Sequence, residues 1–204
     1  MKIDMHVHTK YSGDCGMTPK VIAKVERRCG IGCVAITDHN AFAAFDDFRG
    51  TGISVIKGEE ITTDKGHLIG LFLEEEIMSR NFFDACDEIK RNGGLRMLPH
   101  PFRSHAEPET LAESVDLIEI FNSRTSAGLN AKALELADRR NIPGICGSDA
   151  HFGMELGKCV AELDFNNARK ALLKGNAKLY CEQSPFFVHP ATWAVKLARK
   201  FTGR

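Results

Sequence analysis

Two histidines, His6 and His8, stand two positions apart near the start of the chain. Because successive side chains of a β-strand point to opposite faces, residues two apart point the same way. Asp149 and His151, in the segment GSDAH, repeat this spacing near the other end of the chain. Imidazole and carboxylate groups are ligands that borderline divalent metal ions prefer. Each pair could therefore bind one metal ion from one face of a strand.

More residues of the same types lie at the ends or starts of apolar segments. The full candidate set of metal ligands is His6, His8, Asp14, His39, Glu60, His67, His100, Asp149 and His151. A single histidine in such a place is more often a hydrogen-bonded structural residue than a ligand. Burying so many polar groups without partners would be costly, however, so the set as a whole predicts a metal centre. His105 and His189 lie outside it.

The elements that must position these side chains follow from the hydrophobic pattern. Nine segments have the length and composition of strands: Lys2–His8, Cys33–His39, Ile53–Ile61, His67–Leu73, Leu95–Pro101, Val115–Asn122, Ile142–Asp149, Lys158–Asp164 and Ala177–Cys181. Helical periodicity marks a segment from Thr18 to Gly30 and the segments Phe82–Arg91, Ala127–Arg140 and Asn167–Leu173. Repeated strand–helix units predict a parallel sheet that closes into a barrel, with the chemistry at the carboxyl ends of the strands.

Composition narrows the class of protein. The 204 residues carry 27 basic and 27 acidic side chains, so no overall positive field is present to bind long nucleic acid. We expect no signal peptide, no membrane span and a cytoplasmic location, because the start is charged and apolar runs are short. Seven scattered cysteines indicate reduced thiols that act as small buried hydrophobic groups. We expect a single domain over residues 1–204, with a C-terminal helix at about 190–201 packing its apolar side on the barrel.

Seven motifs occur in a fixed order: DMHVHT, ITDHN, GEEI, GHLIG, PHPF, IEIFN and GSDAH. In this order they resemble the PHP family, the polymerase and histidinol phosphatase domain, over about residues 3 to 157. The first motif alone, H-x-H, also opens many amidohydrolases, whereas the ordered set is specific. The resemblance implies a distorted (β/α)7 barrel of the TIM-like kind.

The same resemblance implies up to three divalent metal ions. Carried over position by position, the ligand groups are His6, His8, Glu60 and Asp149 for one ion, Glu60, His67 and His100 for a second, and Asp14, His39 and His151 for a third. Glu60 would bridge two ions, and the family pattern G-x-E-I selects it over Glu59, which should point to the other face. Asp4 and Asp38 precede ligand positions and would either orient imidazoles or cap turns.

Charge predicts the substrate. Three divalent ions and three carboxylates leave a strongly cationic site, which suits a phosphate ester attacked by a metal-bound hydroxide. Zn, Mn and Fe all fit imidazole ligands. The catalytic candidates are Glu60, Asp149 and His151, and either of the last two could assist the leaving group. The candidates for substrate contact are Arg103, Arg124 and Asn122, which could instead be a surface arginine pair and a turn cap.

Four functions remain open from the sequence. The leading one is hydrolysis of a phosphate ester in a small phosphorylated metabolite or nucleotide. The alternatives are a 3′–5′ exonuclease or oligonucleotide phosphodiesterase acting on short strands, an amidohydrolase, and a non-catalytic metal-binding module. A non-catalytic module would lack a ligand-type residue at one or more of the nine ligand positions, and none is missing here. The segment between Gly70 and Leu95 is too short for a large cap domain, so the substrate stays unassigned.

Overall fold

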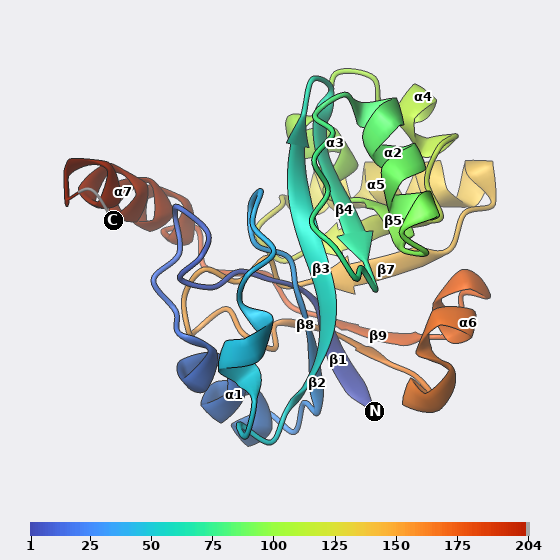
Figure 1. Ribbon diagram of the computed structural model, residues 1–204. Coiled ribbons are helices and arrows are strands. Elements are labelled where there is room, and N and C mark those ends of the chain that lie inside the picture. Colours follow the sequence, from blue (N-terminus) through green and yellow to red (C-terminus); the bar gives the residue numbers. More distant parts are fainter. Residues whose placement is uncertain (203–204) are drawn as a thin grey trace.

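The computed structural model describes residues 1–202 (Figure 1). Its strands are β1 (Lys2–Val7), β2 (Cys33–Ile36), β3 (Ser54–Thr63), β4 (Gly66–Leu71), β5 (Leu95–Leu98), β6 (Leu117–Asn122), β7 (Gly144–Gly147), β8 (Cys159–Glu162) and β9 (Lys178–Cys181). Its helices are α1 (Pro19–Arg28), α2 (Phe82–Arg91), α3 (Pro101–Ser104), α4 (Pro108–Ala112), α5 (Ala127–Arg140), α6 (Ala168–Leu173) and α7 (Val188–Thr202), with short 3₁₀ turns at Phe45–Phe48 and Phe165–Asn167. Every predicted strand forms, whereas α3 and α4 were not predicted.

The strands form one sheet in the order β7-β6-β5-β4-β3-β2-β1-β8-β9. The prediction of an all-parallel sheet is wrong at β4, which runs antiparallel to both β3 and β5. The cause is local, since only Asp64 and Lys65 separate β3 from β4. So short a connection can join only antiparallel neighbours, whereas parallel strands need a crossover of a dozen residues or more. The strands β1–β2–β3 and β5–β6–β7 are parallel, as predicted.

The sheet closes into a nearly complete barrel where the end of β7 meets β1. Val7 bridges Ala150 in parallel, and the amide of Asp149 donates to the His6 carbonyl at 2.8 Å. The first half of β1 pairs instead with antiparallel β8, through Lys2 and Ile3. One edge of β1 is therefore shared between β8 and the segment after β7. The distorted seven-stranded barrel implied by the motifs is confirmed, with β8 and β9 added outside it.

Apolar side chains hold this arrangement together. One buried cluster draws on strands β1 to β8 and includes Ile3, Met5, Ile69, Met97 and Leu117. A second packs α2, α4 and α5 against the sheet, and a third packs α1. Local signals set the helix starts: the Thr18 side chain accepts from the Val21 amide at 3.4 Å, and a proline follows at the first helical position.

The C-terminal helix α7 projects from the barrel (Figure 1). Trp193 and Leu197 on this helix are 67% and 39% exposed, so the expected packing of its apolar side on the barrel is not observed for them. Polar contacts attach the helix instead, because Arg199 donates to the carbonyls of Lys10 and Ser12 at 3.0 and 2.7 Å. Within residues 1–202, no helix has the length and apolar character needed to cross a membrane.

Candidate metal centre

The topology brings all nine ligand candidates to one end of the barrel. Those from the parallel strands lie at or just beyond the carboxyl ends, as in other barrels of this kind. His67 reaches the same place from the start of its strand, because β4 is antiparallel and His67 pairs with Thr62 near the end of β3. The antiparallel hairpin therefore adds a ligand that an all-parallel sheet would have placed at the opposite end.

Four side chains form the first group. The Nε2 atoms of His6 and His8 lie 3.1 Å apart. The Oε2 atom of Glu60 lies 3.4 Å and 3.3 Å from these nitrogens, and Oδ1 of Asp149 lies 3.6 Å and 3.3 Å from them. All four side chains are at most 3% exposed. Four donor atoms thus converge on one small volume.

The second group uses the other oxygen of the same carboxylate. Glu60 Oε1 lies 2.9 Å from His67 Nδ1 and 3.1 Å from His100 Nε2. Glu60 therefore faces two groups of donors with its two oxygens, which is the geometry of a bridging ligand. Glu59 points the other way, and its Oε2 accepts from the Ile77 amide at 3.0 Å.

The third group lies toward the surface. Asp14 Oδ2 is 3.3 Å from His151 Nε2 and 3.6 Å from His39 Nε2. The other ring nitrogen of His39, Nδ1, lies 3.2 Å from Glu60 Oε2, so His39 connects this group with the other two. The three groups implied by the motif resemblance therefore form one continuous cluster.

The residues present fit divalent metal ions. Several ligand atoms in the cluster are buried and make no contact of normal hydrogen-bond geometry among the described residues, although some lie close to a carboxylate: Asp14 Oδ1, His39 Nδ1, His67 Nδ1 and His151 Nε2. Buried polar atoms are almost always satisfied, and a metal ion bound between these atoms would satisfy them. Imidazole nitrogens and carboxylate oxygens within 4.8 Å of one another suit Zn, Mn or Fe.

The carboxylates of the cluster are held in their charged form. Burial alone would raise the pKa of Glu60, but the nearby His39 and His6 keep it well below its usual value. Burial would likewise raise the pKa of Asp149, which Arg103 and His6 hold well below its usual range. Burial lowers the pKa of His39 to about 4, so this imidazole is neutral and able to act as a ligand.

Two residues that were not selected from the sequence orient the ligands. Glu119 Oε1 accepts from His6 Nδ1 at 2.9 Å, and its Oε2 accepts from the His100 amide at 2.8 Å. Ser12 Oγ lies 2.9 Å from His8 Nδ1. The contacts to Nδ1 of His6 and of His8 turn the Nε2 atoms of these two imidazoles toward the cluster. The signal for Glu119 was visible, since it is a carboxylate in the middle of the apolar motif IEIFN.

Asp4 and Asp38 support the backbone around the centre. Asp4 accepts from the amides of Ser148 and Gly157 at 3.1 and 3.3 Å, and burial raises its pKa to about 6. Asp38 accepts from both the amide and the hydroxyl of Thr9 at 2.6 Å. These contacts are to backbone amides and one hydroxyl of distant segments, so they differ from both expected roles, orienting imidazoles and capping a turn.

Arg103 and Asn122 both reach Asp149. Arg103 Nη2 lies 2.6 Å from Asp149 Oδ2, and Asn122 Nδ2 donates to the same oxygen at 3.2 Å. The opposite oxygen, Oδ1, faces His6 and His8. The Arg103 side chain is 28% exposed, whereas Asn122 is fully buried. Arg103 thus contacts Asp149 while part of its side chain stays open to solvent.

Arg124, expected either to contact substrate or to lie at the surface, is instead buried among protein groups. Its Nε is 2.9 Å from Glu155 Oε1, and the two side chains are 5% and 0% exposed. Nη1 lies 3.1 Å from His151 Nδ1, and Nη2 donates to the Val188 carbonyl at 3.1 Å. This guanidinium therefore connects His151, the following loop and the start of α7. Its partners are protein groups, which favours a positioning role.

Replacing Arg124 by Ala is expected to lower the thermal midpoint. The change leaves the buried Glu155 carboxylate without its cation, and breaking a buried ion pair costs about 3–5 kcal/mol. For a chain of this size that corresponds to a fall of roughly 6–20 °C, measurable by circular dichroism. Arg124→Lys should recover part of the loss because it restores the charge. An unchanged midpoint in the Ala variant would contradict the structural role.

Comparisons with known proteins found two family models and a sequence relative that match this chain. The model of the PHP domain matches residues 4–96, and the model described as PHP-associated matches residues 128–176. The chain is 38% identical over 184 residues to the uncharacterised protein MJ0417 of Methanocaldococcus jannaschii, a match that covers 83% of this chain and 73% of that protein.

Solved structures share the fold. A two-domain protein from Bacteroides vulgatus containing a predicted PHP-like metal-dependent phosphoesterase superposes with a TM-score of 0.75 at 22% identity, covering 89% of this chain and 65% of that one. An amidohydrolase from Chromobacterium violaceum with bound sulfate superposes with a TM-score of 0.67 at 18% identity, covering 86% and 97%. The chain thus spans about two thirds of the first of these proteins and nearly all of the second.

Proposed function

Because this chain belongs to the PHP family, we propose that it hydrolyses a phosphate ester in a small phosphorylated metabolite or nucleotide, using two to three bound divalent ions. The observation that carries the proposal is the cluster of nine ligand-type side chains at one end of the barrel, with Glu60 facing two groups of donors at once. A non-catalytic module would have no need of so complete a set.

The charge of the site favours a phosphorylated substrate. When bound, divalent ions at this centre would activate water and offset the negative charge that develops at phosphorus. Asp149 and Glu60 supply the anionic ligands, and Arg103 adds a cation beside Asp149. We also propose that His151, which lies against Asp14 and Arg124, assists the leaving group when its Nε2 atom carries a proton instead of an ion.

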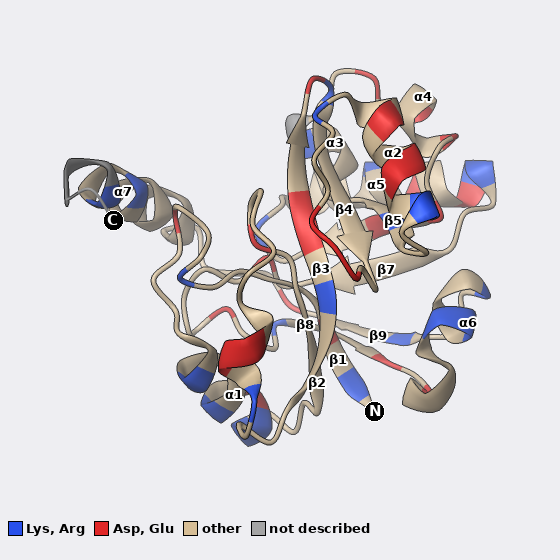
Figure 2. Cartoon of the chain, viewed as in Figure 1, with Lys and Arg blue, Asp and Glu red and all other residues tan. Residues whose placement is uncertain are grey.

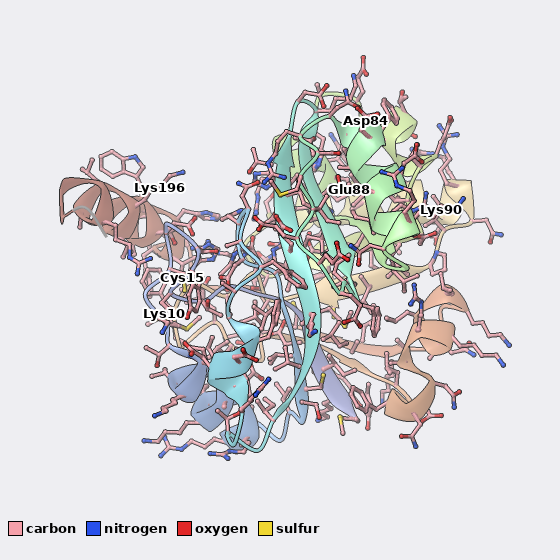
Figure 3. All side chains as sticks on the ribbon, in the orientation of Figure 1. Lys10, Cys15, Asp84, Glu88, Lys90 and Lys196 are labelled. Atoms are coloured by element: carbon pink, nitrogen blue, oxygen red, sulfur yellow. The ribbon has the colours of Figure 1, made fainter. Side chains whose placement is uncertain are left out.

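A cavity of about 470 Å³ opens beside the metal ligands. It is lined by Gly13, Asp14, His39, Asn40, Thr62, His67 and Lys196. This volume lies within the range for small-molecule sites. Lys196 comes from α7 (Figure 3) and adds a cationic side chain to the lining of this cavity. The cavity therefore suits a small anionic molecule that carries negative charge beyond its reacting phosphate.

The distribution of charge argues against long nucleic acid. Figure 2 shows basic residues on α1, α6 and α7 that are separated by acidic and neutral segments. Long strands are bound by a continuous basic groove with aromatic stacking platforms. Short oligonucleotides could still place one phosphodiester at the centre, which keeps a 3′–5′ exonuclease as the second candidate. The likeness to an amidohydrolase structure, at 18% identity, concerns the fold alone.

Arg103→Ala is expected to weaken phosphate binding while leaving the metal content intact. A hydrogen bond to a charged group contributes about 1.5–3 kcal/mol, so KM should rise roughly tenfold or more. Arg103→Lys should recover only part of this, because an ammonium group cannot reproduce the forked contact. Steady-state kinetics with inhibition by inorganic phosphate measures the effect. If KM and the inhibition by inorganic phosphate are unchanged in Arg103→Ala, phosphate binding belongs to the metal ions alone.

The function is tested by a substrate screen with the Mn²⁺-loaded protein. The panel contains phosphorylated metabolites, nucleotides, short oligonucleotides and amide substrates, and inorganic phosphate, released mononucleotide and released amine are each measured. Release of phosphate from small monoesters supports the proposal. Release of mononucleotides alone would favour the exonuclease. Cleavage confined to C–N bonds would overturn the phosphoesterase assignment.

A further inference from the structure

Three cysteines meet on the strands that close the barrel, outside the candidate metal centre. Cys146 lies on β7, Cys159 on β8 and Cys181 on β9, and their sulfur atoms are all within 4.8 Å of one another. Cys146 and Cys159 are fully buried, whereas Cys181 is exposed. The sequence predicted reduced cysteines that act as small buried hydrophobic groups. Cys146 and Cys159 are buried as predicted, whereas Cys181 is not.

Strand pairing explains why the sulfurs are close. Cys159 is directly opposite Cys181 in the antiparallel β8–β9 pair. The next pair along, Lys158 and Glu182, shares a backbone hydrogen bond of 2.7 Å. Hydrogen-bonded and non-hydrogen-bonded pairs alternate, so the cysteines occupy the non-hydrogen-bonded position, where opposite side chains approach most closely. The packing of β7 against both strands then brings Cys146 to the pair.

We propose that Cys146, Cys159 and Cys181 form a second metal site, specific for a thiophilic divalent ion such as Zn²⁺. Zinc binds thiolate sulfur at about 2.3 Å in tetrahedral geometry, which places ligand sulfurs about 3.8 Å apart. The observed sulfurs, all within 4.8 Å, reach this spacing with small side-chain adjustments. Three thiolates leave a fourth position for water on the side of exposed Cys181.

The chemistry of the ligands separates this site from the imidazole and carboxylate centre. Soft thiolates select ions such as Zn²⁺, whereas mixed nitrogen and oxygen donors also accept Mn and Fe. Only the thiolate form of cysteine binds a metal ion, so the three thiols lose their protons as the ion enters.

The position of the cluster indicates a structural role. In the described sheet, β7 and the β8–β9 pair lie at opposite ends of the strand order, so no ladder joins them. An ion held by one sulfur from each strand would cross-link β7 to the β8–β9 pair. Cys146, its ligand on β7, lies three residues before Asp149. Binding should raise the thermal midpoint, because an ion that binds only the folded state stabilises that state.

The test is a titration of the reduced, metal-stripped protein with Cd²⁺ and Co²⁺, followed by ultraviolet absorption. Thiolate-to-metal charge transfer reports sulfur ligation, which the imidazole and carboxylate centre cannot produce. We expect one equivalent of thiolate-bound ion in the unchanged protein, and loss of the band in Cys181→Ser, Cys146→Ser and Cys159→Ser. Cys29→Ser is the matched control, since Cys29 is also exposed but lies outside the cluster.

Cys181→Ser is the decisive variant, because Cys181 is exposed and its replacement should leave the fold intact. Circular dichroism checks that the variant is folded. A missing thiolate band in the unchanged protein would overturn the proposal. So would a band of equal size in Cys181→Ser, or one lost in Cys29→Ser. A Cys159–Cys181 disulfide found by mass spectrometry after purification, with no metal bound to these sulfurs on reduction, would assign the cluster to redox chemistry instead.

Discussion

Glu60→Gln and Asp149→Asn are expected to reduce turnover by roughly 10²–10³-fold or more while the fold stays intact, since loss of a single transition-state contact already costs that much. Each change removes a buried negative charge and keeps the shape of the side chain. Glu60 has histidine nitrogens 2.9–3.4 Å from its two oxygens, so its loss affects two groups of ligands at once. Metal analysis alongside kcat and KM would show how far ion loss accounts for the effect.

The matched control for this prediction is Glu59→Gln. Glu59 is the neighbouring buried carboxyl group on the opposite face of β3, and its pKa is raised to about 7 by burial. It is therefore partly protonated at neutral pH, and an amide resembles the protonated acid. We expect nearly normal kinetics and metal content from this variant. Equal losses in Glu59→Gln and Glu60→Gln would show that the wrong residue has been assigned to the centre.

Removal of the metal ions is expected to abolish activity. We expect the purified protein to contain two to three equivalents of Zn, Mn or Fe at the imidazole and carboxylate centre. Chelation should eliminate turnover, and added metal should restore it. The thermal midpoint should fall as well, because the ions bind only the folded arrangement. Elemental analysis gives the content, and full activity from a metal-free protein would contradict the central proposal.

Metal binding at this centre should also depend on pH. Burial alone would lower the pKa of His8, but hydrogen bonds to Asp149 and Glu60 raise it to about 9 in the metal-free protein. A histidine must be neutral to bind a metal ion, so protons have to leave as the ion enters. The apparent affinity should therefore increase as the pH rises toward 9. Calorimetric titrations in buffers of different ionisation enthalpy would measure the released protons, and no release would contradict this.

Much of the site could be predicted from the sequence because its signals are local. Side chains two positions apart on a strand share a face, so His6 and His8 point the same way. Adjacent side chains point to opposite faces, so Glu60 faces the centre and Glu59 does not. The helices Phe82–Arg91 and Ala127–Arg140 form with the predicted bounds, since their apolar periodicity and end signals lie within the segments themselves. The carboxyl ends of the parallel strands then bring most of the ligands together.

Only the tertiary structure decided which distant groups became neighbours. His67 joins the centre because β4 runs antiparallel, Glu119 supports His6 from across the barrel, and Arg124 is buried by α7. The three cysteines meet because strand register and the packing of β7 bring them together. Hydrophobic periodicity records which face of a strand is buried, but it does not record the neighbour, direction or register of that strand. Those depend on the free energy of closing the whole barrel, to which every strand contributes.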